Sequence, residues 1–276
     1  MDFDELVTTR AGEATEAARD ALKAGTTRLV AVGGDGTLNE VVNGYFDDAG
    51  LPINKAASIG LLSSGTGSDF RRSLGATSSF GSLPIGETRT RLIDAACAKF
   101  TDQDGASVSR VFINVASFGL GGDVSAQVNH WREHLPRWIG GRARFASAAV
   151  AALGRYENKS VSIRVDEREM NISSNLIVVA NGRFAGGGMM LAPHAELDDG
   201  FLEVIVTDGA TRWDVIKELP RIQRGAHLKN RKVTEMRARE VSINSQEPMA
   251  IDLDGEMVGF TPAELRVLPS VIRFMG

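Results

Sequence analysis

The feature that most constrains the fold is a glycine-rich turn that joins an apolar segment to a helical pattern. Val30 to Val32 are apolar, Gly33-Gly34-Asp35-Gly36-Thr37 follow, and hydrophobic residues then recur at helical spacing. The recurring side chains are Leu38, Val41, Val42, Tyr45 and Phe46. Glycines allow a close approach of the backbone to a ligand, and the free N–H groups that start a helix favour anions. The pattern predicts a strand, a phosphate-binding turn and a helix with one buried face.

A second segment repeats this arrangement. Residues 57–62 predict a buried strand, and the glycine-containing residues 63–70 lead into a short helical stretch at 71–74. In a parallel sheet both loops lie at the carboxyl edge of the strands, where open α/β folds bind ligands. Neither loop is a Walker A motif or a dinucleotide fingerprint, because the required Lys-Ser/Thr and glycine spacing are missing. A tight turn without a ligand is the alternative for either loop alone, and two copies favour a binding site.

Asp35 lies within the first glycine turn. A carboxylate beside phosphates is repulsive unless a metal ion or a proton transfer is involved. Its position therefore indicates catalysis.

Composition restricts the class of protein. A chain of 276 residues with 43% hydrophobic residues can bury a core and is long enough for two domains. The net charge of −4 and the pI near 5.7 argue against general nucleic-acid binding. The single cysteine, Cys97, excludes an internal disulfide and is expected in the core. Without an apolar run of about 18 residues or a signal-peptide pattern, we expect a cytoplasmic protein, peripheral to the inner face of the membrane where it meets lipid.

The pattern of predicted helices and strands changes after Leu74. Strand and helix patterns alternate before it, whereas the later part reads as repeated strands interrupted by helical insertions at 123–154 and 211–224. The expected strands cover residues 108–115, 161–165, 176–180, 201–206, 240–244 and 249–253. We therefore predict an α/β plus β protein. A parallel α/β nucleotide-binding domain at 1–91 precedes an antiparallel β-sandwich at 92–267, residues 268–276 return to the first domain, and the ligand site lies between the two.

Four motifs resemble, in the same order, those of the diacylglycerol kinase catalytic-domain family of lipid kinases, to which sphingosine kinases also belong. They are the glycine turn with Asn39 and Glu40, residues 64–70, residues 181–188 continuing through 197–201, and Asp252-Leu253-Asp254-Gly255-Glu256. Ser64 and Ser68 depart from the family pattern. The resemblance extends from about Thr8 to the C-terminus and implies the two-domain architecture shared with NAD kinases.

The resemblance also implies roles for individual residues. ATP would bind through Thr8, Gly33, Gly34, Asp35, Gly36, Thr37, Asn39, Glu40, Gly65, Thr66 and Gly67. Asp35, Asp254 and Glu256 would be catalytic: one of Asp254 and Glu256 takes the proton of the lipid hydroxyl, and the other two acids organise Mg²⁺. The residues alone leave Asp254 and Glu256 equivalent as the base. A plain hairpin turn is the alternative for Asp254-Gly255.

A structural magnesium ion is implied at a second Asp-Gly turn. Its ligands would be the Asp199 side chain with the backbone carbonyls of Glu196 and Phe201. A surface turn without a metal is the alternative.

Members of the family normally begin with a strand that ends in an Asn-Pro-x-x-Gly turn, and this sequence shows no counterpart before Thr8. Residues 8–14 resemble the family's second strand and the loop after it. A helix should follow that ends at Gly25. Its expected buried stripe consists of Ala14, Ala17, Ala18, Ala21 and Leu22. We expect this arrangement to leave a strand edge exposed.

Lipid access is expected from residues 130–155, where tryptophans alternate with arginines as in interfacial elements; a helical hairpin packed on the sandwich is the alternative. The sequence as a whole predicts an ATP- and Mg²⁺-dependent kinase acting at a membrane surface on the hydroxyl of a diacylglycerol-like or long-chain-base lipid, with a homodimer as one possible assembly. The alternatives are a catalytically impaired nucleotide- or lipid-binding relative and an NAD kinase-like enzyme.

Overall fold

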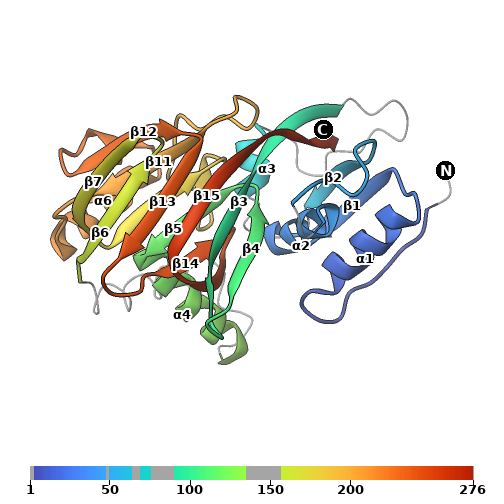
Figure 1. Cartoon of the computed structure of the whole chain (residues 1–276), viewed down its shortest axis with the longest axis horizontal. Coiled ribbons are helices and arrows are strands. Elements are labelled where there is room, and N and C mark those ends of the chain that lie inside the picture. The colour runs from blue at the N-terminus through green and yellow to red at the C-terminus, as the bar shows by residue number, and fades with distance from the viewer. Residues whose placement is uncertain (1–2, 48–49, 64–68, 76–89, 135–156, 276) are drawn as a thin grey trace.

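The computed structural model describes residues 3–47, 50–63, 69–75, 90–134 and 157–275, with the backbone alone for 128–134. Figure 1 shows the helical layer at one end of the molecule and the large sheet at the other. The expected nucleotide-binding residues Gly65, Thr66 and Gly67 lie outside the described residues, and so do the side chains of the expected interfacial element at 130–155.

The N-terminal layer alternates helices and strands, as the sequence predicts. It contains α1 (Glu13–Lys23), β1 (Arg28–Gly33), α2 (Asp35–Tyr45), β2 (Ser58–Ser63) and α3 (Asp69–Ser73). β1 and β2 pair in parallel, and the hydrophobic stripe of α2 is buried against them. The two long helices pack closely at Gly44, where an added methyl group would lie 2.5 Å from the carbonyl oxygen of Thr15.

The N-terminal segment differs from the prediction. Residues 3–9 form no strand, and Thr8 is exposed, so its assignment to a strand is wrong. Within the described part of the chain β1 pairs with β2 alone, and Val32 on β1 is 65% exposed. The expected exposed strand edge is therefore present on β1.

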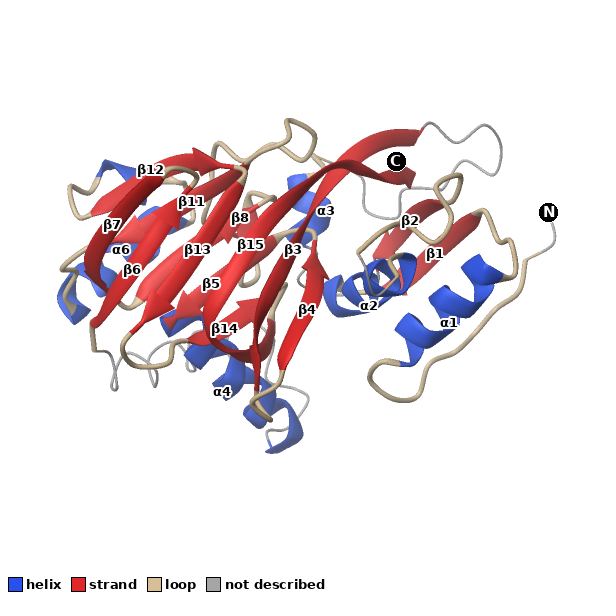
Figure 2. Cartoon of the chain, viewed as in Figure 1, coloured by secondary structure: helices blue, strands red, loops and turns tan. Residues whose placement is uncertain are grey.

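Two long strands connect the helical layer to the rest of the molecule. β3 (Thr90–Asp102) and β15 (Glu256–Met275) pair antiparallel along most of their lengths. The last residues of β15, Arg273–Met275, also pair in parallel with β2 at Ser58–Gly60. One hydrogen-bonded sheet therefore runs through both parts of the molecule, as Figure 2 shows.

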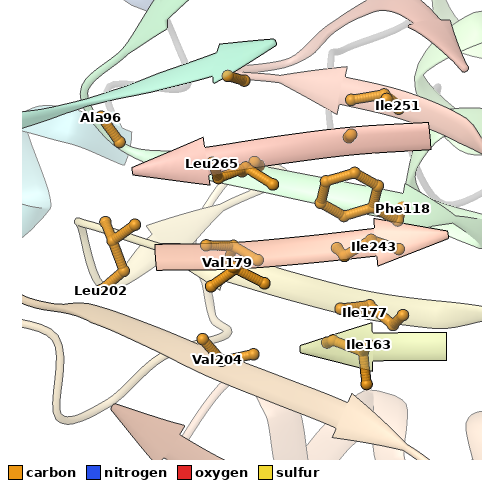
Figure 3. Close-up of a cluster of buried hydrophobic side chains, with 14 of the residues drawn as sticks. Ala96, Phe118, Ile163, Ile177, Val179, Leu202, Val204, Ile243, Ile251 and Leu265 are labelled. Carbon is orange, nitrogen blue, oxygen red and sulfur yellow. The ribbon is translucent and has the colours of Figure 1, made fainter. Parts of the chain in front are cut away.

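The C-terminal part is an antiparallel sheet that curls around a core. Its strand order is β12-β11-β8-β5-β14-β15-β13-β6-β7, and β6 and β7 approach β12 and β11. Figure 3 shows the enclosed side chains, among them Phe118, Ile163 and Leu265. Besides β3 and β15, the strands of this part are β4 (Ser107–Phe112), β5 (Val115–Gly119), β6 (Lys159–Val165), β7 (Arg168–Ser174), β8 (Leu176–Ala180), β11 (Leu202–Thr207), β12 (Val233–Ala238), β13 (Glu240–Ser245) and β14 (Ala250–Leu253). This arrangement confirms the predicted fold class.

Several predicted elements change at their ends. The single strand expected at 108–115 is two strands, because β4 ends at Phe112 and β5 begins at Val115. Cys97 lies on β3, where it is partly buried and packs against the core of the N-terminal layer. The helical insertions contain α4 (Leu120–His134) and α6 (Arg212–Ile222), and the short hairpin β9 (Phe184–Ala185) with β10 (Met189–Met190) and the 3₁₀ helix η1 (Ala226–Lys229) complete the described elements. None of the described helices has the length and hydropathy needed to cross a bilayer.

Candidate active site

Asp254 lies at the turn between β14 and β15 and connects three parts of the chain. Asp254 and Gly255 have φ angles of 51° and 95°, the left-handed conformation of a tight turn. The Asp254 carboxylate accepts four hydrogen bonds. The backbone N–H groups of Ile113, Asn114 and Val115 donate at 3.0 Å each, and the Asn39 side chain donates at 2.8 Å. Burial raises the pKa of Asp254, and these four donors act against that shift.

The N–H groups that bind Asp254 come from the break between β4 and β5. Residues 113 and 114 belong to neither strand, so their N–H groups do not enter the sheet ladder. The interruption therefore supplies the donors that hold the β14–β15 turn in place.

A chain of side-chain contacts extends from Asp254 to Glu256. Asn39, which is buried on α2, donates to Asp254 and accepts a hydrogen bond from Arg110 at 2.9 Å. Arg110 also pairs with Oε2 of Glu256 at 2.5 Å. The glutamate is fixed by an arginine whose orientation is set by the same asparagine that binds Asp254.

The glycine turn lies next to Glu256. A methyl group added to Gly36 would lie 3.8 Å from Oε1 of Glu256. Gly33 is required by crowding, because a side chain there would meet the Thr37 hydroxyl at 2.4 Å. Gly34 caps α2, and Thr37 lies in the first turn of that helix. The structure therefore brings the first glycine motif and the last acidic motif together.

Asp35 connects the first glycine turn to the start of α3. Its two carboxylate oxygens accept hydrogen bonds from the backbone N–H groups of Asp69, at 3.0 Å, and Phe70, at 3.3 Å. Asp69 is itself buried and accepts a hydrogen bond from the N–H of Gly187 at 2.7 Å. The two helix starts and the 182–188 loop are thereby held at one place.

A cleft of about 1090 Å³ opens beside these residues. It lies between the two long helices of the N-terminal layer and strands β3, β4, β6, β13 and β15. Glu256 and Arg110 line it together with further charged side chains of both signs. These are the cations Arg19, Lys99, Arg164 and Arg266 and the acids Glu16, Glu40, Asp47, Asp166, Glu240 and Glu264. Ligand sites typically occupy about 300–1,000 Å³, so the cleft has room for a nucleotide.

Two expected nucleotide-binding residues have other surroundings. Glu40 lines the cleft, but its carboxylate also accepts a hydrogen bond from the N–H of Ala14 at 3.1 Å and so caps α1. Thr8 lies in the exposed segment before that helix and is not among the described residues that line the cleft.

The sequence analysis missed Arg110 and Asp252. Arg110 is a lone arginine on a strand, and only the fold shows that it faces Glu256. Asp252 points inward on β14, where it is 6% exposed and one of its oxygens, Oδ2, has no hydrogen-bond partner in the described structure. Burial raises the pKa of Asp252 to about 7. Its place at an inward position of a predicted strand was the available signal.

An acid in the glycine turn fits the magnesium ion that accompanies ATP. Mg²⁺ in kinase sites is held by one or two carboxylates together with the substrate phosphates. Asp35 can supply such a carboxylate, because each of its oxygens accepts only one hydrogen bond, whereas each oxygen of Asp254 already accepts two.

In the structure, groups of the protein engage the Asp199 carboxylate. One Asp199 oxygen accepts the N–H of Phe201 at 3.0 Å, and the other is paired with Arg237, which also contacts Glu203 at 3.2 Å. Arg237 and Arg239 both stack on the Phe201 ring, at 4.5 and 4.9 Å. The positive charge at this loop comes from arginine.

A buried acid ties the same loop to the sheet. Asp94 is fully buried on β3 and accepts hydrogen bonds from the N–H groups of Gly200, at 2.7 Å, and Ser270, at 2.6 Å. Ser270 lies where the pairing of β15 with β3 shifts register. Asp94 therefore ties the Gly200 turn to β15.

Comparisons with known proteins agree with this geometry. Residues 1–97 match the model of the diacylglycerol kinase catalytic domain, and residues 114–276 match that of the YegS C-terminal NAD kinase beta sandwich-like domain. A protein of Chromohalobacter salexigens named "Probable lipid kinase YegS-like" is 30% identical over 91% of this chain and 76% of its own length. A diacylglycerol kinase of Staphylococcus carnosus is 31% identical over 95% of this chain and 81% of its own.

A solved structure shows the same fold. The crystal structure of a diacylglycerol kinase from Bacillus anthracis superposes with a TM-score of 0.69 and 21% identity, covering 98% of this chain and 83% of that one. Three findings lead to one conclusion. Two domain models match in order, relatives are about 30% identical over most of both chains, and the fold brings the glycine turn next to Glu256. This chain belongs to the diacylglycerol kinase family and is a lipid kinase.

Proposed function

We propose that this protein transfers the γ-phosphoryl group of Mg²⁺-bound ATP to the hydroxyl of a diacylglycerol-like lipid at a membrane surface. The observation that carries the proposal is the chain of contacts Asp254–Asn39–Arg110–Glu256, which holds one carboxylate and one guanidinium in the cleft beside the glycine turn. Phosphoryl transfer requires alignment and charge neutralisation more than covalent chemistry, and this geometry supplies both.

The nucleotide occupies the cleft with its phosphates toward residues 33–37. The N–H groups at the start of α2 and the guanidinium of Arg110 then face the phosphates. Magnesium held by Asp35 and the phosphates would neutralise phosphate charge that develops during transfer.

Glu256 is the proposed base. Asp254 is a poor candidate because its two oxygens already accept four hydrogen bonds, so it is assigned to positioning. Glu256 is partly exposed to the cleft and its Oε1 faces Gly36. The lipid hydroxyl gives its proton to Glu256 as its oxygen bonds the γ-phosphorus, and the bond to the β-phosphate oxygen breaks to release ADP.

Transfer of radiolabelled phosphate from ATP tests the proposal. The acceptors are vesicles with diacylglycerol, vesicles with a long-chain base, and NAD. Label in diacylglycerol that requires Mg²⁺ supports the proposal, label in NAD assigns the NAD kinase-like alternative, and ATP binding without transfer to any acceptor assigns the impaired relative.

A further inference from the structure

Helix α6 exposes an apolar stripe bordered by positive charge. Thr211 and Asp214 form a capping box that fixes the start of the helix. From there Trp213, Ile216 and Lys217 follow at i, i+3 and i+4, which places them on one face of the helix. Trp213 is 70% exposed and Ile216 is 42% exposed, although both are large hydrophobic side chains.

The opposite face of α6 already supplies the packing of this helix. Glu218 and Ile222 are buried, and with Val215 they line a small apolar cavity against β8, β11 and β12. The core therefore does not need Trp213 or Ile216.

The charge around this helix is opposite to that of the whole chain. Residues 212–232 contain seven lysines and arginines and two acids, a net charge of +5 in a chain whose total is −4. Both acids are paired, Asp214 with Lys232 at 2.7 Å and Glu218 with Arg221 at 3.0 Å. Six of the cations are exposed: Arg212, Lys217, Arg221, Arg224, Lys229 and Arg231.

We propose that the α6 surface, defined as the exposed side chains of residues 212–231, docks the enzyme onto an anionic lipid bilayer. An amphipathic helix with tryptophan and isoleucine on one side and lysine and arginine around them is the composition of an interfacial element. The cations are attracted to anionic head groups, while the acidic remainder of the chain is repelled, so the field of the membrane orients the molecule. The inference rests on the proposed lipid acceptor, and it places the membrane contact outside the cleft. Figure 1 shows α6 at the end of the molecule opposite α1.

Vesicle sedimentation of the full chain tests this surface. The vesicles contain either phosphatidylcholine alone or phosphatidylcholine with about 30% phosphatidylglycerol, an anionic lipid that attracts lysine and arginine side chains. The test variant combines Trp213→Ala, Lys217→Gln and Arg224→Gln. Its matched control, Leu51→Ala with Lys23→Gln and Lys55→Gln, removes one exposed hydrophobic residue and two exposed lysines from the N-terminal layer.

We expect the wild type and the control to bind the anionic vesicles, and the α6 variant to bind at least about tenfold more weakly. The α6 variant should phosphorylate a water-soluble short-chain diacylglycerol at the wild-type rate, and its melting temperature should match that of the control. Equal vesicle binding by the α6 variant and the wild type would overturn the α6 surface and leave the kinase proposal intact. Loss of heparin or RNA binding without loss of vesicle binding would overturn it in favour of a polyanion site. If the wild type binds no vesicles, the membrane-surface part of the proposed function fails as well.

Discussion

The molecule contains two Asp-Gly turns that look alike in the sequence and have different surroundings in the fold. At Asp254-Gly255, four N–H groups from α2 and the β4–β5 break enclose the carboxylate. At Asp199-Gly200, the carboxylate binds its own loop and an arginine that is half exposed. An Asp-Gly dipeptide predicts a turn, and the elements packed against it decide whether its carboxylate becomes an anchor or a surface ion-pair partner.

The difference also separates two ways of neutralising an acid. Asp254 is neutralised by backbone dipoles whose positions are fixed by the strands, so its geometry cannot adjust without moving the sheet. Asp199 is neutralised by a flexible guanidinium that also reaches Glu203. We therefore expect substitutions at the first turn to affect both folding and catalysis, and those at the second to have small effects.

The largest expected effect is that of Asp254→Asn. An amide oxygen cannot replace both carboxylate oxygens, and its NH₂ group faces N–H donors, so we expect a loss of about 3 kcal/mol in the free energy of unfolding. Because the contacts to Glu256 depend on this turn, phosphoryl transfer should fall by about 100-fold or more. Urea unfolding and initial rates measure the two effects. Asp102→Asn is the control, since its carboxylate accepts two N–H bonds in the β3–β4 turn. If the Asp254→Asn protein keeps full activity and full stability, Asp254 does not anchor its turn, and the contrast between the two turns is lost.

Glu256→Gln separates chemistry from anchoring. We expect phosphoryl transfer to fall by about 100-fold while stability changes by less than about 1 kcal/mol, because Glu256 is partly exposed and has one charged partner. Glu264→Gln removes a carboxylate from the same strand and the same cleft and should keep most of the activity. If Glu256→Gln and Glu264→Gln reduce the rate equally, the loss of negative charge in the cleft explains the effect, and Glu256 is not the base.

The pH dependence of stability extends the comparison to the buried acid near each turn. Burial raises the pKa of Asp252, beside Asp254, and of Glu203, beside Asp199, to about 7 in the folded protein. In the unfolded chain both lose their protons near pH 4, about the ordinary value for these acids. Between pH 4 and 7 the unfolded state binds fewer protons, so stability should decrease as the pH rises through this window.

Asp252→Asn and Glu203→Gln should each reduce that decrease, by about 1–2 kcal/mol between pH 5 and 7. The reduction should be larger for Asp252, because Oδ2 of Asp252 has no partner in the described structure whereas Glu203 contacts Arg237. Urea unfolding of both variants at pH 5 and pH 7 makes the measurement. An unchanged slope in both variants contradicts the assignment.

The smallest effect is expected at the second turn. Arg237→Gln leaves Asp199 and Glu203 without their shared cation, but the arginine is half exposed, so we expect a loss of about 1 kcal/mol or less and activity within about threefold of wild type. Added Mg²⁺ should not change the melting temperature of the nucleotide-free wild type. If Mg²⁺ raises the melting temperature by several degrees, a metal ion displaces Arg237. The two turns would then differ because a metal neutralises Asp199 whereas backbone dipoles neutralise Asp254.

Local patterns predicted the parts of the fold that depend on neighbours in the sequence. The stripe of α2 and the glycine turn were identified because their spacing alone determines a buried face and a helix start. The strand lengths were not, since β3 and β15 are defined by pairing across more than 150 residues, and burial of their alternate residues does not indicate where one strand ends.

The site divides in the same way. The acids were found because they lie in compact motifs, and the base was left open between Asp254 and Glu256 because only tertiary contacts distinguish them. Arg110 could not be identified from sequence, since one arginine on a strand carries no local signal. The break at residues 113 and 114 was likewise hidden within one apolar run.

The length of β15 has a mechanical consequence. Because its 20 residues pair with β13 and β14 at one end and with β2 at the other, and β3 runs beside it, the walls of the cleft are joined by a twisted ribbon and not by a hinge. A ribbon of paired strands bends elastically over its whole length, so opening the cleft stores energy that closing returns. Substrate exchange in this enzyme should therefore involve small displacements that are shared by many residues of the ribbon, with no single pivot.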